Sequence, residues 1–294
     1  MPNFDAITID QLRRRRSAKW TLIPPGVLPA WVAEMDFPLD DGVRAALADS
    51  IAHDDCGYAN GAGVGDAFAG FVRLRYGWEL DPRGVFVIPD VLVGIAEILR
   101  TLREPGDRIV VNSPVYPPFY RVVGEVERKI EDVPLLRGDD GAWSLDFAGL
   151  ERAFAGGAKT YLLCSPHNPL GMVFDAATLT RIAELAKAYG VLVIADEIHA
   201  PLTMPGATFV PFLPIADRLD CDAVALCSAT TVIGYGSLMV ADSQALSGFG
   251  MLAAIGEVTC LSTALFLLPA WLFPRKAVTE QDVDVSPASG APLR

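Results

Sequence analysis

The stretch VLVIADEIH, residues 191–199, decides the fold of this chain. A continuous run of β-branched and aliphatic residues ends abruptly in acidic and polar ones, which is the pattern of a buried strand that delivers side chains to a site. Similar apolar runs recur elsewhere. We predict strands at 84–88 (GVFVI), 108–112 (RIVVN), 160–164 (TYLLC), 191–195 (VLVIA) and 223–227 (AVALC).

Segments with helical spacing separate these runs. Residues 91–102 form one such segment, and residues 179–189 form a second that is followed by Gly190, a typical C-cap. The apolar side of the second helix consists of Leu179, Ile182, Leu185 and Ala186. Apolar strands that alternate with helices predict an α/β fold, with a parallel or mixed sheet covered by helices on both faces.

Composition limits the classes of function. The net charge of −12 argues against a nucleic-acid partner, because no basic face is available to neutralise phosphates. The one basic cluster, at 13–16, is either a solvated arm or an anion contact. The five cysteines form no CxxC pair, which is typical of a reducing cytosol and predicts no metal site. The opening MPNFDAITID shows no secretory signal.

Polar residues follow four of the predicted strands, where ligands of such sheets bind. Asp196 could be a metal ligand, a general base or the partner of a cationic ring nitrogen. Asn168 has an amide that can hydrogen-bond a phenolic oxygen, and Tyr116 belongs to an aromatic shelf at 113–120 suited to stacking on a flat heterocycle. The helix that opens at Val91 has free N–H groups that could receive a phosphate.

These elements occur together with longer phrases: LRRRRSAKW, LPAWVAEMDFPL, CGYAN, SPVYPPFY, LLCSPHNPLG and VIADEIHAPL. In these phrases residues 10–229 resemble the fold-type-I enzymes that depend on pyridoxal 5′-phosphate (PLP), a class I/II aminotransferase-like group. Within that group they resemble the MalY/PatB-type cystathionine β-lyases, or C–S lyases. The resemblance implies a cytoplasmic homodimer that acts on thioether amino acids such as cystathionine, by β-elimination to thiol, pyruvate and ammonia.

The resemblance also implies roles for single residues at the cofactor ring. Asp196 pairs with the pyridinium nitrogen and keeps it protonated, so that the ring acts as an electron sink. Asn168 bonds the phenolic oxygen and Tyr116 stacks on the ring face. His199 lies near the cofactor without an assigned role.

At the phosphate, the resemblance implies that the backbone amides of Val91 and Leu92 act together with the hydroxyls of Ser228 and Thr230. Tyr58 would reach the phosphate of a neighbouring subunit, since these enzymes build their sites across a dimer interface.

Thr231 departs from the family pattern. The family motif runs S-x-[ST]-K, whereas residues 228–231 read SATT. The missing lysine is both the covalent anchor of PLP and the base that removes the substrate α-proton, and threonine can do neither near pH 7.

The arginine that grips the substrate carboxylate belongs to a C-terminal small domain, which has no counterpart in residues 232–294. We therefore expect PLP to be bound non-covalently and the lyase activity to be impaired, which leaves open whether the chain is an enzyme. The alternatives are a catalytically dead truncated or fused remnant and a membrane-tethered PLP-binding protein.

The tail has a different character. Residues 223–241 carry no charge and residues 248–273 carry only Glu257, and both stretches reach the length of about 20 residues that a membrane span needs. The tail resembles the last membrane helices of RND-superfamily (MMPL-type) exporters; the alternative is buried core helices in place of the small domain.

We predict an N-terminal arm at 1–40, a truncated PLP-binding large domain at 41–229, hydrophobic, candidate membrane-spanning helices at 230–273 and a disordered tail at 274–294.

Overall fold

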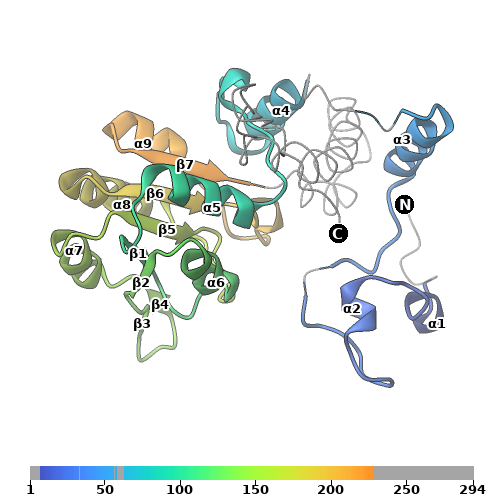
Figure 1. Cartoon of the computed structure of the whole chain (residues 1–294), viewed down its shortest axis with the longest axis horizontal. Helices are drawn as coiled ribbons and strands as arrows, with labels where there is room; N and C mark the ends of the chain where they lie inside the picture. Colours follow the sequence, from blue (N-terminus) through green and yellow to red (C-terminus); the bar gives the residue numbers. More distant parts are fainter. Residues whose placement is uncertain (1–6, 33, 56, 58–62, 228–294) are drawn as a thin grey trace, which may run out of the picture.

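A computed structural model describes residues 7–32, 34–55, 57 and 63–227. Its centre is a parallel sheet (Figure 1) in the order β2-β1-β5-β6-β7. The strands are β1 (Arg108–Val111), β2 (Lys129–Asp132), β5 (Thr160–Cys164), β6 (Leu192–Asp196) and β7 (Ala223–Leu226). The chain adds β2 on one side of β1 and the later strands on the other. The direction of winding therefore reverses between β1 and β5, which is where ligands bind in open α/β sheets.

Helices cover both faces of this sheet (Figure 1). On one face lie α5 (Val91–Leu102) and α6 (Pro118–Glu125); on the other lie α7 (Phe147–Ala155), α8 (Ala176–Tyr189) and α9 (Leu213–Leu219). Alternate residues of a strand point to opposite faces of the sheet and contribute to separate hydrophobic cores. Ile194 packs with α5 and α6, whereas Val193 packs with α7 and α8. Asp196 has the parity of Ile194, so its side chain belongs to the α5/α6 face.

The predicted α/β class is confirmed, and four of the five predicted strands are present within one residue of their predicted ends. The helix predicted at 91–102 has those bounds. The helix predicted at 179–189 begins earlier, at Ala176, because the Asp175 side chain accepts the Thr178 amide hydrogen and caps it. Gly190 ends that helix with a φ of 64°, as expected of a glycine C-cap.

The strand predicted at 84–88 is wrong. Its first residue ends the short 3₁₀ helix η2 (Pro82–Gly84), which the Asp81 side chain caps. Beyond it, Phe86 is 83% exposed and pairs with none of the strands that the structure describes. The Ile88 side chain packs beside Gly94 and Leu226 instead. The apolar run thus supplies a packing residue between α5 and β7, without joining the ladder.

The other elements lie mostly before the sheet. They are α1 (Ile9–Leu12), α2 (Ala18–Thr21), α3 (Asp41–Ala52), α4 (Val64–Tyr76), the 3₁₀ helix η3 (Ala200–Leu202) and the antiparallel pair β3 (Leu136–Arg137) and β4 (Trp143–Ser144). Tyr76 at the end of α4 packs on Phe209, with ring centroids 4.9 Å apart. This contact joins α4 to the loop that precedes α9.

Within the described residues, no helix is long and apolar enough to cross a membrane. The apolar stretch predicted from 223 begins with the residues of β7, which are part of the sheet, so a span starting at 223 is wrong. Residues 228–294 lie outside the described part of the chain. They contain the rest of the first candidate span and all of the second. The predicted division into domains remains a prediction.

Candidate functional site

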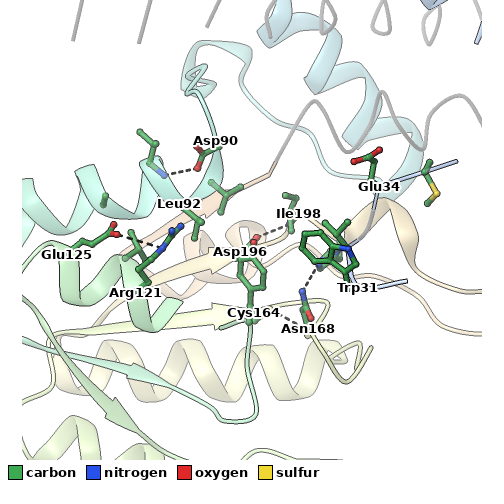
Figure 2. Close-up of a pocket in the computed structure, with 18 of the residues that line it drawn as sticks. Trp31, Glu34, Asp90, Leu92, Arg121, Glu125, Cys164, Asn168, Asp196 and Ile198 are labelled. Carbon is green, nitrogen blue, oxygen red and sulfur yellow. Dashed lines mark hydrogen bonds and ion pairs between the residues drawn. The ribbon is translucent and has the colours of Figure 1, made fainter. Parts of the chain in front are cut away.

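A cavity of about 920 Å³ opens at the carboxyl ends of β1, β5 and β6. Its floor consists of residues that follow these strands, one side consists of α5 and α6, and its roof is the N-terminal segment 31–39. In Figure 2, Asp196 lies between Leu92 and Asn168, with Arg121 and Glu125 toward one end and Trp31 and Glu34 toward the other. The cavity therefore lies at the point where the winding of the sheet reverses.

Asp196 is the last residue of β6 and is only 3% exposed. Its Oδ1 accepts a hydrogen bond from the Ile198 backbone amide at 3.1 Å, and among the described residues no lysine or arginine lies within ion-pair distance of it. Burial raises the pKa of this carboxyl to about 6, against the lowering effect of the Ile198 amide. Above that pH the site holds a buried carboxylate that a bound cation would stabilise.

Cys164 and Asp196 are register partners on neighbouring strands, so their side chains share one face. Burial, and next the charge of Asp196, raise the pKa of the Cys164 thiol to about 12. The thiol is therefore a small neutral group at neutral pH. Its sulfur accepts the Asn168 backbone N–H at 3.3 Å, which holds the turn after β5 against the sheet.

The Asn168 side chain is oriented by His199. Its Nδ2 lies 3.4 Å from His199 Nε2. Because an amide nitrogen only donates, Nε2 accepts, which requires a neutral imidazole; burial lowers the pKa of His199 and favours that form. Among the described residues the second N–H of the amide has no hydrogen-bond partner and is available to a ligand, as the role predicted for Asn168 requires.

Tyr116 lines the cavity as a half-buried ring that packs edge-to-face on Phe119, with centroids 5.5 Å apart. Burial, and next the charges of Asp196 and Asp90, raise the pKa of its hydroxyl, so the phenol stays neutral. The predicted aromatic shelf is only partly present, because Phe119 is fully buried in the core and Tyr120 faces outward. Tyr116 is the one aromatic side chain of 113–120 at the cavity.

The N-terminus of α5 forms the next part of the wall. The Asp90 carboxylate accepts the Val93 amide hydrogen at 2.9 Å. The amides of Val91 and Leu92 belong to the N–H groups that a helix leaves unbonded at its start, and both residues line the cavity. An anion could bind there, but the Asp90 charge opposes it, and the Arg121 guanidinium at the wall is shared with Glu125 at 3.7 Å.

Sequence reasoning missed several lining residues, among them Trp31, Glu34 and Arg121. Trp31 and Glu34 belong to the phrase LPAWVAEMDFPL, which served to recognise the family but received no role. A tryptophan and a carboxylate within a phrase that marks the family were the available signal. Arg121 carried no signal, because it lies within an ordinary amphipathic helix.

None of the lysines that the structure describes lines the cavity. Lys19 bonds Asp36, and Lys187 bonds the Leu219 carbonyl at 2.7 Å. Lys129 and Lys159 do not line the cavity either. Within the described ranges the cavity therefore contains no lysine amine.

Four residues that the sequence singled out belong to parts of the chain that the structure does not describe. Tyr58, Ser228, Thr230 and Thr231 lie outside the described residues. Their roles remain predictions.

The fold and the cavity define an α/β protein with a cavity at the winding reversal of a parallel sheet and a buried carboxylate, Asp196, in its lining. The sequence model of the family Aminotransferase class I and II matches residues 45–233. The chain belongs to this family, which confirms the resemblance predicted from its motifs at that level.

Two similar proteins have names that are more specific than that of the family. A Mycobacterium leprae protein, provisionally named a cystathionine beta-lyase, is 43% identical over 77% of this chain and 57% of its own length. The cystathionine beta-lyase of Corynebacterium glutamicum is 38% identical over 69% of this chain and 53% of its own. The chain thus spans just over half the length of these relatives.

A solved structure shows the same fold. A PLP-dependent beta-cystathionase of Corynebacterium diphtheriae, also provisionally named, superposes with a TM-score of 0.72 at 28% identity. The superposition covers 90% of this chain and 74% of the other. These comparisons give no support to the predicted exporter-like tail.

Proposed function

We propose that this chain binds PLP non-covalently in the cavity, as a relative of the C–S β-lyases, and that thioether amino acids such as cystathionine are the substrate class. The observation that carries the proposal is Asp196, a buried carboxylate without a cationic partner among the described residues. A protonated pyridine nitrogen is a cation of the right kind for this position, and the relatives named above supply the ligand class.

The described residues fit the ring of PLP. Asp196 would hold a proton on the ring nitrogen, the free N–H of Asn168 would donate to the phenolic oxygen, and Tyr116 would cover one face. When bound, PLP supplies an electron sink for charge that develops at the substrate α-carbon. The chain's own contribution is to orient the ring and to keep its nitrogen protonated.

The fit at the phosphate is weaker. The α5 amides of Val91 and Leu92 can donate to a phosphate, but the Asp90 carboxylate at the same helix end repels it. We propose that the hydroxyls of Ser228 and Thr230, and Tyr58 from a second copy in a homodimer, complete the phosphate site.

Activity is a separate question from binding. Thr231 stands at the position of the Schiff-base lysine, and no lysine of the described ranges lines the cavity. These two observations favour the second candidate function, a PLP-binding protein without lyase activity. The proposed large domain at 41–229 would then hold the cofactor without the group that anchors it and moves the α-proton.

Borohydride trapping separates the two candidates. The purified chain is incubated with PLP and reduced, and the modified peptides are mapped by mass spectrometry while pyruvate release from cystathionine is measured. We expect scattered substoichiometric labelling and no pyruvate. A stoichiometric pyridoxyl group on one lysine, together with pyruvate release, would establish the active lyase and contradict both the non-covalent mode of binding and the non-catalytic candidate.

Location and assembly are proposed from the family resemblance and the tail. A cytoplasmic homodimer is the first proposal, and attachment to a membrane through 230–273 is the competing one. Fractionation of cells followed by sedimentation of the recovered protein distinguishes them: recovery as a dimer from the supernatant supports the first, and recovery with membranes supports the second.

A further inference from the structure

The roof of the cavity, where the structure describes it, contains no helix or strand. Between residues 31 and 39 every described residue is in irregular backbone, yet the segment supplies Trp31, Glu34, Met35 and Phe37 to the lining. Irregular backbone has no ladder of its own to hold it. Its position over the cavity must therefore come from other contacts.

Lys19 makes the first of these contacts. Its side chain is buried, with the residue 6% exposed, and its ammonium donates to the Glu34 carbonyl at 2.6 Å and to Asp36 Oδ2 at 2.7 Å. Trp20 Nε1 donates to the other oxygen of Asp36 at 2.8 Å. Burial alone would raise the pKa of Asp36, but the hydrogen bonds from Lys19 and Trp20 hold it below its usual value.

Arg15 and Ser17 add a second set of contacts on the same segment. The Arg15 guanidinium donates to the Met35 carbonyl at 3.0 Å and the Asp36 carbonyl at 2.8 Å. The Ser17 hydroxyl donates to Glu34 Oε1 at 2.5 Å. Consecutive residues of the roof are thus held by side chains from 15–20.

The arginines of the basic run at 13–16 therefore differ in their environments and partners. Arg13 is exposed and pairs loosely with Asp10 at 3.8 Å, as expected of a solvated arm. Arg15 is half-buried and bonds backbone carbonyls. Neither of the two interpretations of the run describes Arg15, because its partner is the roof of this chain's own cavity.

We propose that Arg15, Ser17, Lys19 and Trp20 form a clamp that positions the roof segment over the cavity and thereby determines how tightly a ligand is held there. The clamp residues are positioning residues, since they act through segment 31–39. Where PLP is the ligand, the inference rests on the proposed function.

Two measurements on Lys19→Met test the clamp. The first is the rate at which a glutamate-specific protease cuts the Glu34–Met35 bond, with the cut after Glu79, in an exposed loop, as internal standard. The second is the dissociation constant of PLP by equilibrium dialysis. Arg13→Met is the matched control, because it removes a cation from the same run without touching the roof.

We expect Lys19→Met to speed cleavage after Glu34 at least tenfold and to weaken PLP binding at least fivefold, with Arg13→Met within twofold of the parent in both. Saturating PLP should slow that cleavage in the parent and have less effect in Lys19→Met, because coupling between ligand and roof is reciprocal. Lys19→Arg, which keeps the charge, should lie closer to the parent than Lys19→Met does. If Lys19→Met fails to fold by far-ultraviolet circular dichroism, Trp20→Phe, which removes only one hydrogen bond, replaces it with smaller effects of the same sign.

Unchanged cleavage after Glu34 overturns the clamp. Faster cleavage with unchanged PLP affinity overturns its link to the ligand. If the parent chain binds no PLP, the proposed function fails, while the cleavage rates still decide whether the clamp holds the roof.

Discussion

Asp196 and Trp31 line the same cavity, but the structure holds them by different means. Asp196 ends a strand whose preceding residues, Ile194 and Ala195, are fully buried, and its backbone belongs to the parallel ladder. Trp31 is 55% exposed and belongs to a segment whose described residues form no helix or strand. The floor of the cavity is thus part of the cooperative core, whereas the roof depends on a few side-chain contacts. The roof can change position at a much smaller free-energy cost than the floor.

Ile194→Ala should have the largest effect on the floor. Ile194 belongs to β6 and is fully buried in the core between the sheet and the helices α5 and α6, and deleting such a side chain leaves a cavity. We expect the free energy of unfolding to fall by about 2–5 kcal/mol, as measured by urea denaturation. A loss below about 0.5 kcal/mol would mean that β6 is outside the cooperative core.

Asp196→Asn should change how stability depends on pH. The folded-state pKa of Asp196 is raised from 3.8 to about 6, so its contribution to stability is present below pH 4 and is lost as the pH rises through about 6. Asparagine has no such loss. The variant should therefore gain up to about 3 kcal/mol relative to the parent between pH 4 and pH 7.

Thermal or urea unfolding of the two proteins across that pH range, without PLP, gives this difference. If the stability of the two proteins changes with pH in the same way, the pKa of the Asp196 carboxyl is not raised by folding.

Asp90→Ser should strengthen PLP binding. Serine keeps the helix cap on α5 but removes the negative charge beside the proposed phosphate position. We expect the affinity for PLP to rise about threefold, and the affinity for pyridoxal, which lacks the phosphate, to stay unchanged. Weaker PLP binding by a folded variant would mean that the phosphate lies elsewhere.

Trp31→Ala should have the smallest effect on stability. The side chain is more than half exposed and belongs to the roof. We expect the free energy of unfolding to stay within about 0.5 kcal/mol of the parent. A loss comparable to that of Ile194→Ala would show that roof and floor form one cooperative unit.

The floor was predictable from sequence for a physical reason. Buried strands leave continuous apolar runs, and a parallel sheet brings the residues that follow them to one edge, so Asp196, Asn168 and Tyr116 could be grouped before the structure. The run at 84–88 failed because an apolar composition does not show whether a neighbouring strand is available. The clamp was not predictable, because contacts such as Lys19 with Asp36 join side chains to an irregular segment 15–22 residues away and leave no periodic pattern.

Position 231, a threonine in this chain, marks the limit of what sequence and fold together show. The motif shows Thr231 where the family has its lysine, and none of the described lysines lines the cavity. Both observations concern catalysis. Neither bears on whether the floor binds the cofactor ring.

The most direct test of the central claim is the dissociation constant of PLP for the parent chain, Asp196→Asn and the control Asp217→Asn, an exposed carboxylate on α9 away from the cavity. We expect saturable binding of one PLP per chain by the parent and the control, and binding about thirtyfold weaker by Asp196→Asn, since a hydrogen bond to a charged group contributes about 1.5–3 kcal/mol. Equal affinity of Asp196→Asn and the parent, or no binding by the parent, would contradict the account.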